Sequence, residues 1–171
     1  MNRRVWTGVA AGTLAGIAGV GTSLWRHRAE NAPAPDIWGL SFPAIDGRTA
    51  SMAARRGKPL LLNFWATWCA PCAIEMPLLD VFSREAAPRG WSVLALAVDS
   101  AEPVHRFLTE RALSLPVALA GPGGIELSRR LGNSVGALPF TVAFGANGEV
   151  RDRKLGRLDE AILERWLREV H

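Results

Sequence analysis

The chain has 171 residues, of which 49% are hydrophobic and 21% are charged, and it contains only two cysteines. Its length suits one well-buried domain with a short appendage, and so few cysteines exclude a domain held together by several disulfides. The formal net charge is +4, but four of the 20 basic and one of the 16 acidic residues precede residue 36, which leaves 16 basic and 15 acidic residues in the remainder. Such an almost neutral remainder argues against nucleic acid as a partner.

A run without charges lies near the start of the chain: "WTGVAAGTLAGIAGVGTSLW", at residues 6–25, is flanked by arginines on both sides. A helix needs about 20 mainly apolar residues to cross a bilayer, and this run lacks the amphipathic stripe of a soluble helix. We therefore predict an uncleaved signal anchor, with one transmembrane helix, within residues 1–30. The alternative is a signal peptide that is removed, although its nearest small-residue cleavage signal, at residues 32–34, lies beyond the basic flank.

A short proline-containing stretch, "NAPAPD" at residues 31–36, follows the predicted anchor. Closely spaced prolines favour an extended and semi-rigid chain, so this stretch is predicted to be a linker. The globular domain is accordingly expected at residues 37–171.

The first strong strand signal is "PLLLNFW" at residues 59–65, an apolar run that is too short for a helix and suits a buried central strand. From Cys72 onwards the apolar residues have helical spacing. Pro77 falls inside this predicted helix and is expected to kink it. The apolar positions that define the helix are Ile74, Leu78, Val81 and Phe82.

Two further strands, with a helix between them, are predicted in the middle of the chain. The strands are "WSVLALAV" at residues 91–98 and "PVALA" at residues 116–120. The helix between them is marked by Val104, Phe107, Leu108 and Ala112. The turn-rich "GPGG" at residues 121–124 matches no phosphate-loop spacing and is interpreted as a plain loop.

The C-terminal part combines a hairpin and a helix. "FTVAF" at residues 140–144 and "EVRDRKL" at residues 149–155 flank Asn147 and Gly148, a strong signal for a β-hairpin. The last helix is predicted from about Asp159, with an apolar face formed by Ile162, Leu163, Trp166, Leu167 and Val170. Strands that alternate with helices, closed by a hairpin and a helix, predict a mixed α/β sheet covered on both faces.

Both cysteines lie in "CAPC", between the strand at residues 59–65 and the helix that follows it. Cys69 is expected at the N-terminus of that helix, where unpaired backbone N–H groups and the helix dipole stabilise a thiolate. Pro71 fits this position because the N–H groups of the first helical turn have no partner within the helix. We predict that Cys69 is the nucleophile and Cys72 the resolving thiol.

Other roles for the cysteine pair fit less well. Zinc needs four ligands, and His27, His105 and His171 are scattered along the chain, so no metal site is predicted. Attachment of c-type haem requires histidine directly after the second cysteine, but that residue is Ala73. A purely structural disulfide would close a very small loop and would restrain the unfolded chain little. The pair is interpreted as a redox-active disulfide that needs no further cofactor.

The motif "NFWATWCAPCAIEMP" at residues 63–77 resembles thioredoxin-fold proteins of the TlpA/ResA/DsbE type, which are membrane-anchored thiol:disulfide oxidoreductases of bacterial envelopes. The resemblance covers roughly residues 36–170 and implies a thioredoxin-like fold with a central mixed sheet flanked by helices. Pro77 matches the helix-kinking proline of such folds. "GALPF" at residues 136–140 matches the loop where they place a cis-proline, which would be Pro139.

The resemblance also implies site residues. Glu75 matches the acidic residue that these proteins carry three positions after the second cysteine, and we predict that it accepts or shuttles the proton of Cys72. The alternative is that Glu75 only complements the helix dipole. Asn63 stands where cytoplasmic thioredoxins keep a buried aspartate, which is why the proton transfer is assigned to Glu75. The residues predicted to bind the substrate are Trp68, Ala70, Pro71, Leu138 and Pro139.

The functional expectation is a reductase, because a proline directly before the second cysteine resembles reducing thioredoxins more than the oxidising DsbA type. The resemblance implies a single-pass protein of the bacterial inner membrane with its catalytic domain in the periplasm. It also implies a DsbD- or CcdA-like membrane electron donor, with apocytochrome c as the leading substrate and copper-site proteins as the second. A disulfide oxidase or isomerase, a thiol peroxidase and a metal-handling binding protein are the alternatives.

Overall fold

The computed structural model describes residues 36–171 of the chain. The predicted anchor and all but the last residue of the predicted linker therefore lie outside the described residues. Within residues 36–171, no helix combines the length and the apolar character needed to cross a membrane.

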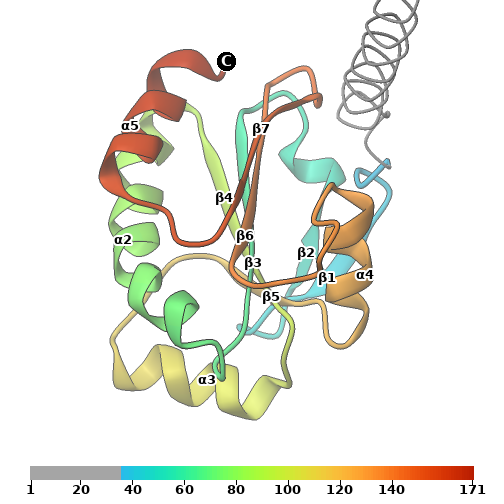
Figure 1. Cartoon of the computed structure of the whole chain (residues 1–171), viewed down its shortest axis with the longest axis vertical. Helices are drawn as coiled ribbons and strands as arrows, with labels where there is room; N and C mark the ends of the chain where they lie inside the picture. The colour runs from blue at the N-terminus through green and yellow to red at the C-terminus, as the bar shows by residue number, and fades with distance from the viewer. Residues whose placement is uncertain (1–35) are drawn as a thin grey trace, which may run out of the picture. The chain divides into compact units, whose positions relative to one another are not determined.

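A five-stranded mixed sheet forms the centre of the domain (Figure 1). Its strand order is β5-β4-β3-β6-β7, in which β3, β4 and β5 run parallel to one another and β6 and β7 are antiparallel to their neighbours. All five runs that had been predicted as strands form strands of this sheet. Their bounds are Leu60–Trp65 for β3, Ser92–Ala97 for β4, Val117–Leu119 for β5, Phe140–Phe144 for β6 and Val150–Leu155 for β7.

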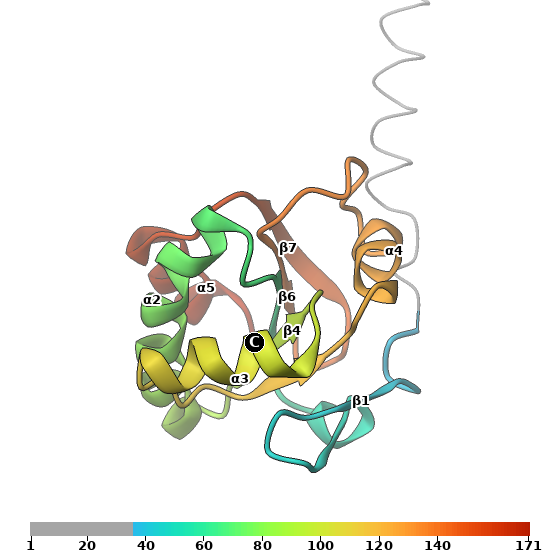
Figure 2. The ribbon, with the colours of Figure 1, turned by 90° about the horizontal axis from the view of Figure 1, so that it is seen from below.

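Helices cover both faces of this sheet (Figure 2). Apolar residues from α2 (Ala70–Ala86), α3 (Ala101–Glu110) and α5 (Glu160–Glu169) pack on one face. The other face is covered by α4 (Gly123–Arg130) and by apolar residues that precede the sheet in the chain. Since all six residues of β3 are buried, a strand with so continuous an apolar run can only lie at the centre of a sheet covered on both sides. The predicted thioredoxin-like α/β fold is confirmed.

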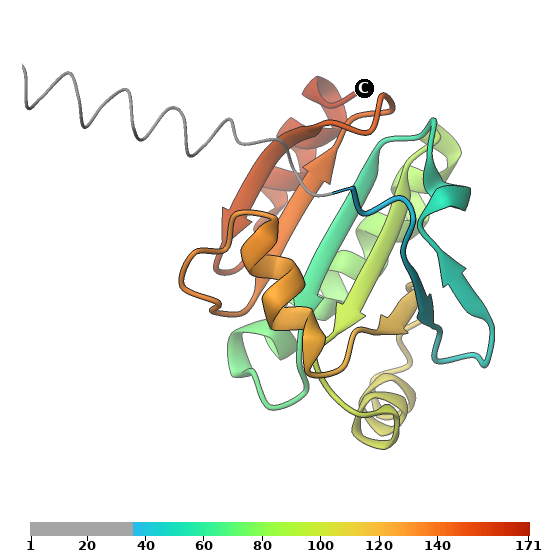
Figure 3. The same ribbon diagram turned by 90° about the vertical axis from the view of Figure 1, so that its right-hand side faces the viewer.

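A small hairpin that the sequence patterns did not predict lies beside the β5 edge of the sheet (Figure 3). It pairs β1 (Ser41–Pro43) with β2 (Thr49–Ser51), and a short 3₁₀-helix, η1 (Ala53–Arg55), follows. The N–H of Ile45 donates to the carbonyl of Val117 at 3.1 Å, which attaches the hairpin to β5. The hairpin therefore covers a sheet edge that would otherwise leave backbone groups unpaired.

Helix α2 exists as predicted, with Pro77 inside it, but its buried face coincides only in part with the apolar positions that define its spacing. Ile74 and Val81 are 59% and 41% exposed, respectively. The residues that α2 buries are Cys72, Glu75, Met76, Leu79, Asp80, Phe82 and Ala86. The hydropathy pattern misleads because two acidic side chains lie on the buried face, where each accepts hydrogen bonds from residues distant in the sequence.

A smaller difference concerns the end of α3, for which the pattern had included Ala112. The helix ends at Glu110, and Ala112 has a φ of 50°, in the left-handed region that cannot continue a helix. Helix α4 begins at Gly123, so the second half of "GPGG", which had been interpreted as a loop, is helical, and so is the segment after it, for which no element had been predicted. The predicted hairpin at Asn147 and Gly148 is confirmed, and so is the start of the last helix near Asp159, whose side chain caps α5.

Candidate active site

A disulfide joins Cys69 and Cys72 at the point where the chain leaves the central strand β3 and enters α2. Cys69 occupies the N-cap position in an extended conformation, and its sulfur accepts a hydrogen bond from the N–H of Cys72 at 3.3 Å. Pro71 lies in the first turn, as predicted. Once the disulfide is reduced, backbone N–H groups at this helix N-terminus and the positive end of the helix dipole would stabilise a thiolate on Cys69.

The two cysteines differ in their exposure to solvent. Cys69 is 7% exposed, whereas Cys72 is completely buried. Cys69 is therefore the cysteine of the pair that retains some contact with solvent, whereas Cys72 has none. This difference fits the predicted roles of nucleophile and resolving thiol, which remain predictions.

Hydrogen bonds to Asp99, which no sequence pattern had indicated, hold the loop before Cys69. The backbone N–H and the hydroxyl of Thr67 both donate to Asp99, at 3.0 and 2.6 Å. Burial acts to raise the pKa of Asp99, but the hydrogen bonds from Thr67 and Ser100 outweigh it and lower the pKa below its usual value. An ionised Asp99 thus ties the cysteine loop to the end of the neighbouring strand β4. The only sequence signal for this role of Asp99 was its position directly after the strand predicted at residues 91–98.

Glu75 is a buried acid, only 1% exposed, and it lies one helical turn after Cys72. Residues three apart in a helix are neighbours on one face, so its carboxyl group shares a side of α2 with the buried thiol. One carboxyl oxygen accepts from the side-chain amide of Asn63 at 2.9 Å, and the other accepts from the N–H of Leu158 at 2.8 Å. The helix dipole alone does not account for this arrangement, because Glu75 lies beyond the first turn and its side chain is buried in this network. The role of Glu75 in proton transfer stays a prediction.

The surroundings of Glu75 raise its pKa above the usual value for a glutamate. Burial is the largest cause, since it disfavours the charged form. The hydrogen bonds from Leu158 and Asn63, and the nearby charge of Arg157, oppose the effect without cancelling it. A carboxyl group with a raised pKa is better suited to exchange protons near neutral pH than an ordinary glutamate.

The predicted cis-proline lies at the same end of the sheet as the cysteines. The peptide bond between Leu138 and Pro139 is cis, and β6 begins at the next residue. Strand register pairs Phe140 with Phe64, so Pro139 lies opposite the end of β3, from which the chain continues to Cys69. Pro139 is buried and Leu138 is half-buried. The structure thus brings the proline loop and the cysteine loop to the same end of the central strands.

Exposed apolar side chains occur in the segments that carry the cysteines and the proline loop. Trp68, next to Cys69, is 68% exposed, and Ala70 and Pro71 are exposed as well. Trp65 is fully buried, in agreement with the buried central strand predicted at residues 59–65. The exposure of Trp68 fits the prediction that it contacts substrate, a role that remains a prediction, as do those of Ala70, Pro71, Leu138 and Pro139.

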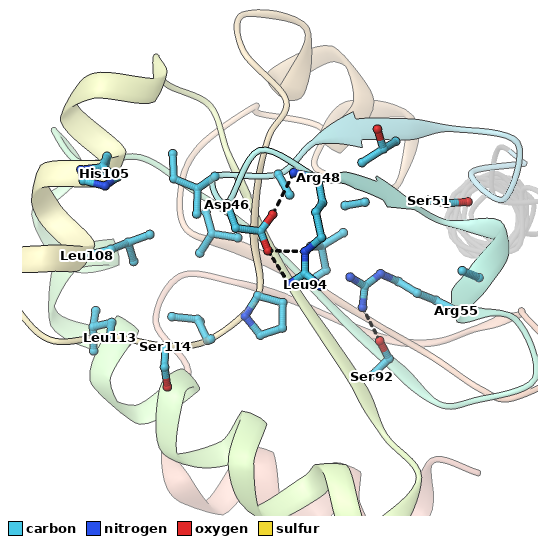
Figure 4. Close-up of a pocket in the computed structure, with 18 of the residues that line it drawn as sticks. Asp46, Arg48, Ser51, Arg55, Ser92, Leu94, His105, Leu108, Leu113 and Ser114 are labelled. Atoms are coloured by element: carbon cyan, nitrogen blue, oxygen red, sulfur yellow. Dashed lines mark hydrogen bonds and ion pairs between the residues drawn. The ribbon is translucent and has the colours of Figure 1, made fainter.

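A separate hollow of about 880 Å³ lies between the β1–β2 hairpin, the end of α3 and the start of β4 (Figure 4). Arg55 donates to the hydroxyl of Ser92 in it, and Asp46 pairs with Arg48. Ser92 opens β4 and is paired with the first residue of β3, whereas the cysteines follow the last residue of β3. This hollow is therefore at the opposite end of the parallel strands from the disulfide, and none of the predicted site residues lines it.

Comparisons with known proteins agree with this geometry. Residues 29–167 match the model of the redoxin family. The chain is 32% identical to the thiol-disulfide oxidoreductase ResA of Oceanobacillus iheyensis over 127 residues, which are 74% of this chain and 64% of that protein, so it spans less than two thirds of that relative. It is 32% identical to the thioredoxin-like protein YneN of Bacillus subtilis over 142 residues, which are 81% of this chain and 78% of YneN. Among solved structures, a thiol:disulfide interchange protein of Chlorobium tepidum superimposes with a TM-score of 0.70 at 26% identity, covering 81% of this chain and 95% of that one.

Proposed function

Because this chain belongs to the redoxin family, among the thioredoxin-fold thiol-disulfide oxidoreductases of the TlpA/ResA/DsbE type, we propose that it reduces disulfides in other proteins of the bacterial envelope. One observation carries the proposal. The disulfide joins a slightly exposed cysteine at a helix N-terminus to a fully buried cysteine, and a buried acid lies a single helical turn further on.

The proposed reaction starts from the reduced pair. The Cys69 thiolate attacks one sulfur of the target disulfide, which forms a mixed disulfide and releases the other target sulfur as a thiolate. Cys72 then attacks the Cys69 sulfur and releases the second target sulfur, so the target gains two electrons and Cys69 and Cys72 become a disulfide. Glu75, in its ionised form, accepts the proton that Cys72 gives up.

The proposed direction of electron flow is supported by Pro71, since a proline before the second cysteine is similar to that of reducing thioredoxins. Apocytochrome c is the leading proposed substrate, because reduction of the cysteines in its C-x-x-C-H site permits haem attachment. Copper-site proteins are the second. The exposed ring of Trp68 beside Cys69 supports a protein rather than a small molecule as the substrate.

The proposed location is the inner membrane, with the catalytic domain in the periplasm. The charge-free run at residues 6–25 supports an anchor. A reductase in that compartment needs a continuous electron supply, for which a DsbD- or CcdA-like membrane protein is the proposed donor.

The reduction potential of Cys69 and Cys72 tests this proposal. The full chain in detergent would be equilibrated with defined thiol buffers, and the fraction of disulfide measured. A potential near that of thioredoxin, about −270 mV, would support a reductase, whereas a potential near that of DsbA, about −120 mV, would make the protein a disulfide donor. Peroxide consumption that requires only Cys69 would instead favour the thiol peroxidase alternative.

A further inference from the structure

Three buried polar side chains from three different elements meet behind the disulfide. Asn63 on β3, Glu75 on α2 and Thr141 on β6 are each at most 1% exposed. The side-chain NH₂ group of Asn63 donates to Glu75 at 2.9 Å and to the hydroxyl of Thr141 at 3.0 Å. Strand register places Asn63 directly opposite Thr141, so the amide is held between the strand and the helix.

The amide oxygen of Asn63 is buried and has no hydrogen-bond partner in the described part of the chain. Buried polar atoms are normally paired, so an unpartnered one calls for a physical reason. As placed, the amide presents only donors to Glu75, which is the arrangement that an ionised carboxylate needs. A protonated carboxyl group carries one O–H donor, and the NH₂ group of Asn63 cannot accept it.

A half-turn of the amide about its last side-chain bond exchanges the positions of its oxygen and nitrogen. The oxygen would then accept from the O–H of a protonated Glu75 and from the hydroxyl of Thr141, which can either accept or donate. The place that the unpartnered oxygen occupies in one orientation is taken by the NH₂ group in the other, and in both it lacks a hydrogen-bond partner in the described part of the chain. One asparagine can thus complement both protonation states of its neighbour.

We propose that Asn63 is a positioning residue that holds Glu75 beside Cys72 in both protonation states, donating to the carboxylate and, after rotation of its amide, accepting from the carboxylic acid. This inference rests on the proposed function, in which Glu75 receives the Cys72 proton. The glutamate then keeps its place before and after the transfer, and Thr141 completes the hydrogen bonding in each state.

An aspartate at position 63 could not do the same, because an ionised aspartate only accepts hydrogen bonds and would repel Glu75. The other charged groups around Glu75 are few. Arg157, between β7 and α5, lowers the pKa of Glu75, and strand register places Lys154 of β7 opposite Thr141. Strands β3, β4 and β6 contain no titratable side chain, and Asp159 is directed at the N–H of Ile162 in its own helix.

The test uses nuclear magnetic resonance of the full chain in detergent with reduced cysteines. The Glu75 carboxyl carbon and the side-chain amide nitrogen of Asn63 would be followed against pH. We expect both signals to change with one midpoint. Asn133 is a matched control in the same sample, because it is also a buried asparagine with an unpartnered oxygen, but its amide donates to Ser128 and to the carbonyl of Ala137 instead. A constant Asn63 signal across the Glu75 midpoint, or an Asn133 signal that changes with it, would overturn the proposal.

Variants provide a second measurement. Asn63→Ala removes the hydrogen bond to Glu75 in both protonation states. Because the bond to the charged carboxylate is the stronger of the two, the Glu75 midpoint should rise by about one pH unit, and the exchange rate below that midpoint should fall about tenfold. Asn63→Asp has nearly the same shape, and the higher of the two midpoints of the resulting acid pair should lie above that of Glu75 in the unaltered protein. Asn133→Ala should leave the Glu75 midpoint unchanged.

These outcomes separate the inference from the proposed function. If exchange and its dependence on Glu75 persist while neither change at Asn63 moves the midpoint, Asn63 has no positioning role and the proposed function stands. If the unaltered protein shows no exchange with protein disulfides, the proposed function fails, and with it the link between the Asn63 amide and proton transfer.

Discussion

The two ends of the central strands use polar residues in opposite ways. At the end that carries the disulfide, Glu75, Asn63 and Thr141 are buried and hydrogen-bonded to one another. At the other end, the large hollow is bordered by Asp46 and Arg48, an ion pair whose two side chains are 44% and 85% exposed (Figure 4). Buried polar groups are retained only with compensating interactions, whereas exposed ion pairs contribute little. The proposed chemistry therefore lies at the end with the buried polar groups and not at the end with the large hollow.

The largest expected effect at the disulfide end comes from the cysteines themselves. Cys69→Ser should reduce protein disulfide reduction to background and form no adduct with substrate, because the accessible sulfur is lost. Cys72→Ser should instead accumulate a mixed disulfide through Cys69, since no resolving thiol remains. Non-reducing gels with a disulfide-containing substrate would show the difference. Equal trapping by both variants would contradict the assigned roles.

The next effect concerns Glu75 and has the opposite sign for activity and stability. Glu75→Gln should slow disulfide exchange about 100-fold at neutral pH, which is the lower range for loss of a proton-transfer group. The exchange rate would be measured against pH for the unaltered protein and for Glu75→Gln. The change of rate with pH that is assigned to titration of Glu75 should be absent in the variant. Unchanged rates and an unchanged cysteine titration would remove the proposed proton transfer.

The stability effect of the same change follows from the raised pKa of Glu75. Its folded-state pKa lies above the unfolded value of about 4.5, so its contribution to the free energy of unfolding is complete below that pH and is lost as the pH rises through the folded-state pKa. Glu75→Gln should remove this slope and make the protein more stable at neutral pH, by about 1.4 kcal/mol for each unit of pKa elevation. Denaturant unfolding of both proteins at several pH values would measure the effect. A Glu75→Gln variant that loses stability towards high pH more steeply than the unaltered protein would contradict the direction of the shift.

A smaller effect is expected at Trp68. Trp68→Ala should raise the KM for a protein substrate about tenfold, as for an aromatic contact residue, while exchange with glutathione disulfide stays unchanged. Its free energy of unfolding should change by less than about 0.5 kcal/mol, because the ring is 68% exposed. Trp65→Ala is the matched comparison, with an expected loss of about 3–5 kcal/mol, because that ring is fully buried. An equal loss of small-molecule and protein exchange for Trp68→Ala would argue against a docking role.

The smallest effect is expected in the hollow at the other end. Asp46→Asn and Arg55→Ala should leave the exchange rate within about twofold of the original, because distant sites without shared partners rarely couple by more than a few tenths of a kcal/mol. The rate with a protein substrate would be compared with that of Trp68→Ala in the same assay. A selective loss with the protein substrate would show that the substrate also contacts the hollow, and the comparison between the two ends would have to be revised.

Much of the fold follows from local patterns in the sequence. Hydrophobic runs of the right length marked β3, β4 and β6, and Asn147 with Gly148 marked the hairpin between β6 and β7. The place of Cys69 at a helix N-terminus followed from the strand before it and the helix after it. The motif around the cysteines, through its resemblance to a known family, also pointed to Glu75 and to the loop of Pro139.

Other features depend on contacts between residues far apart in the chain, and no local pattern encodes them. The apolar spacing indicated the buried face of α2 only in part, because Glu75 and Asp80 are polar and yet are buried with donors supplied by distant residues. The β1–β2 hairpin escaped prediction because its strands have three residues each and are held by the β5 edge.

The sequence by itself determined most of the elements and the chemical identity of the redox pair, because periodicity, capping and the spacing of two cysteines act over a few residues. Only the tertiary structure decided which groups surround that pair. Asn63 and Thr141 are separated by 78 positions, and Glu75 and Leu158 by 83, so their hydrogen bonds exist only once the sheet and its helices have assembled. Burial in that assembly, which no stretch of the chain can provide alone, raises the pKa of Glu75 and leaves Cys69 as the more exposed of the two cysteines.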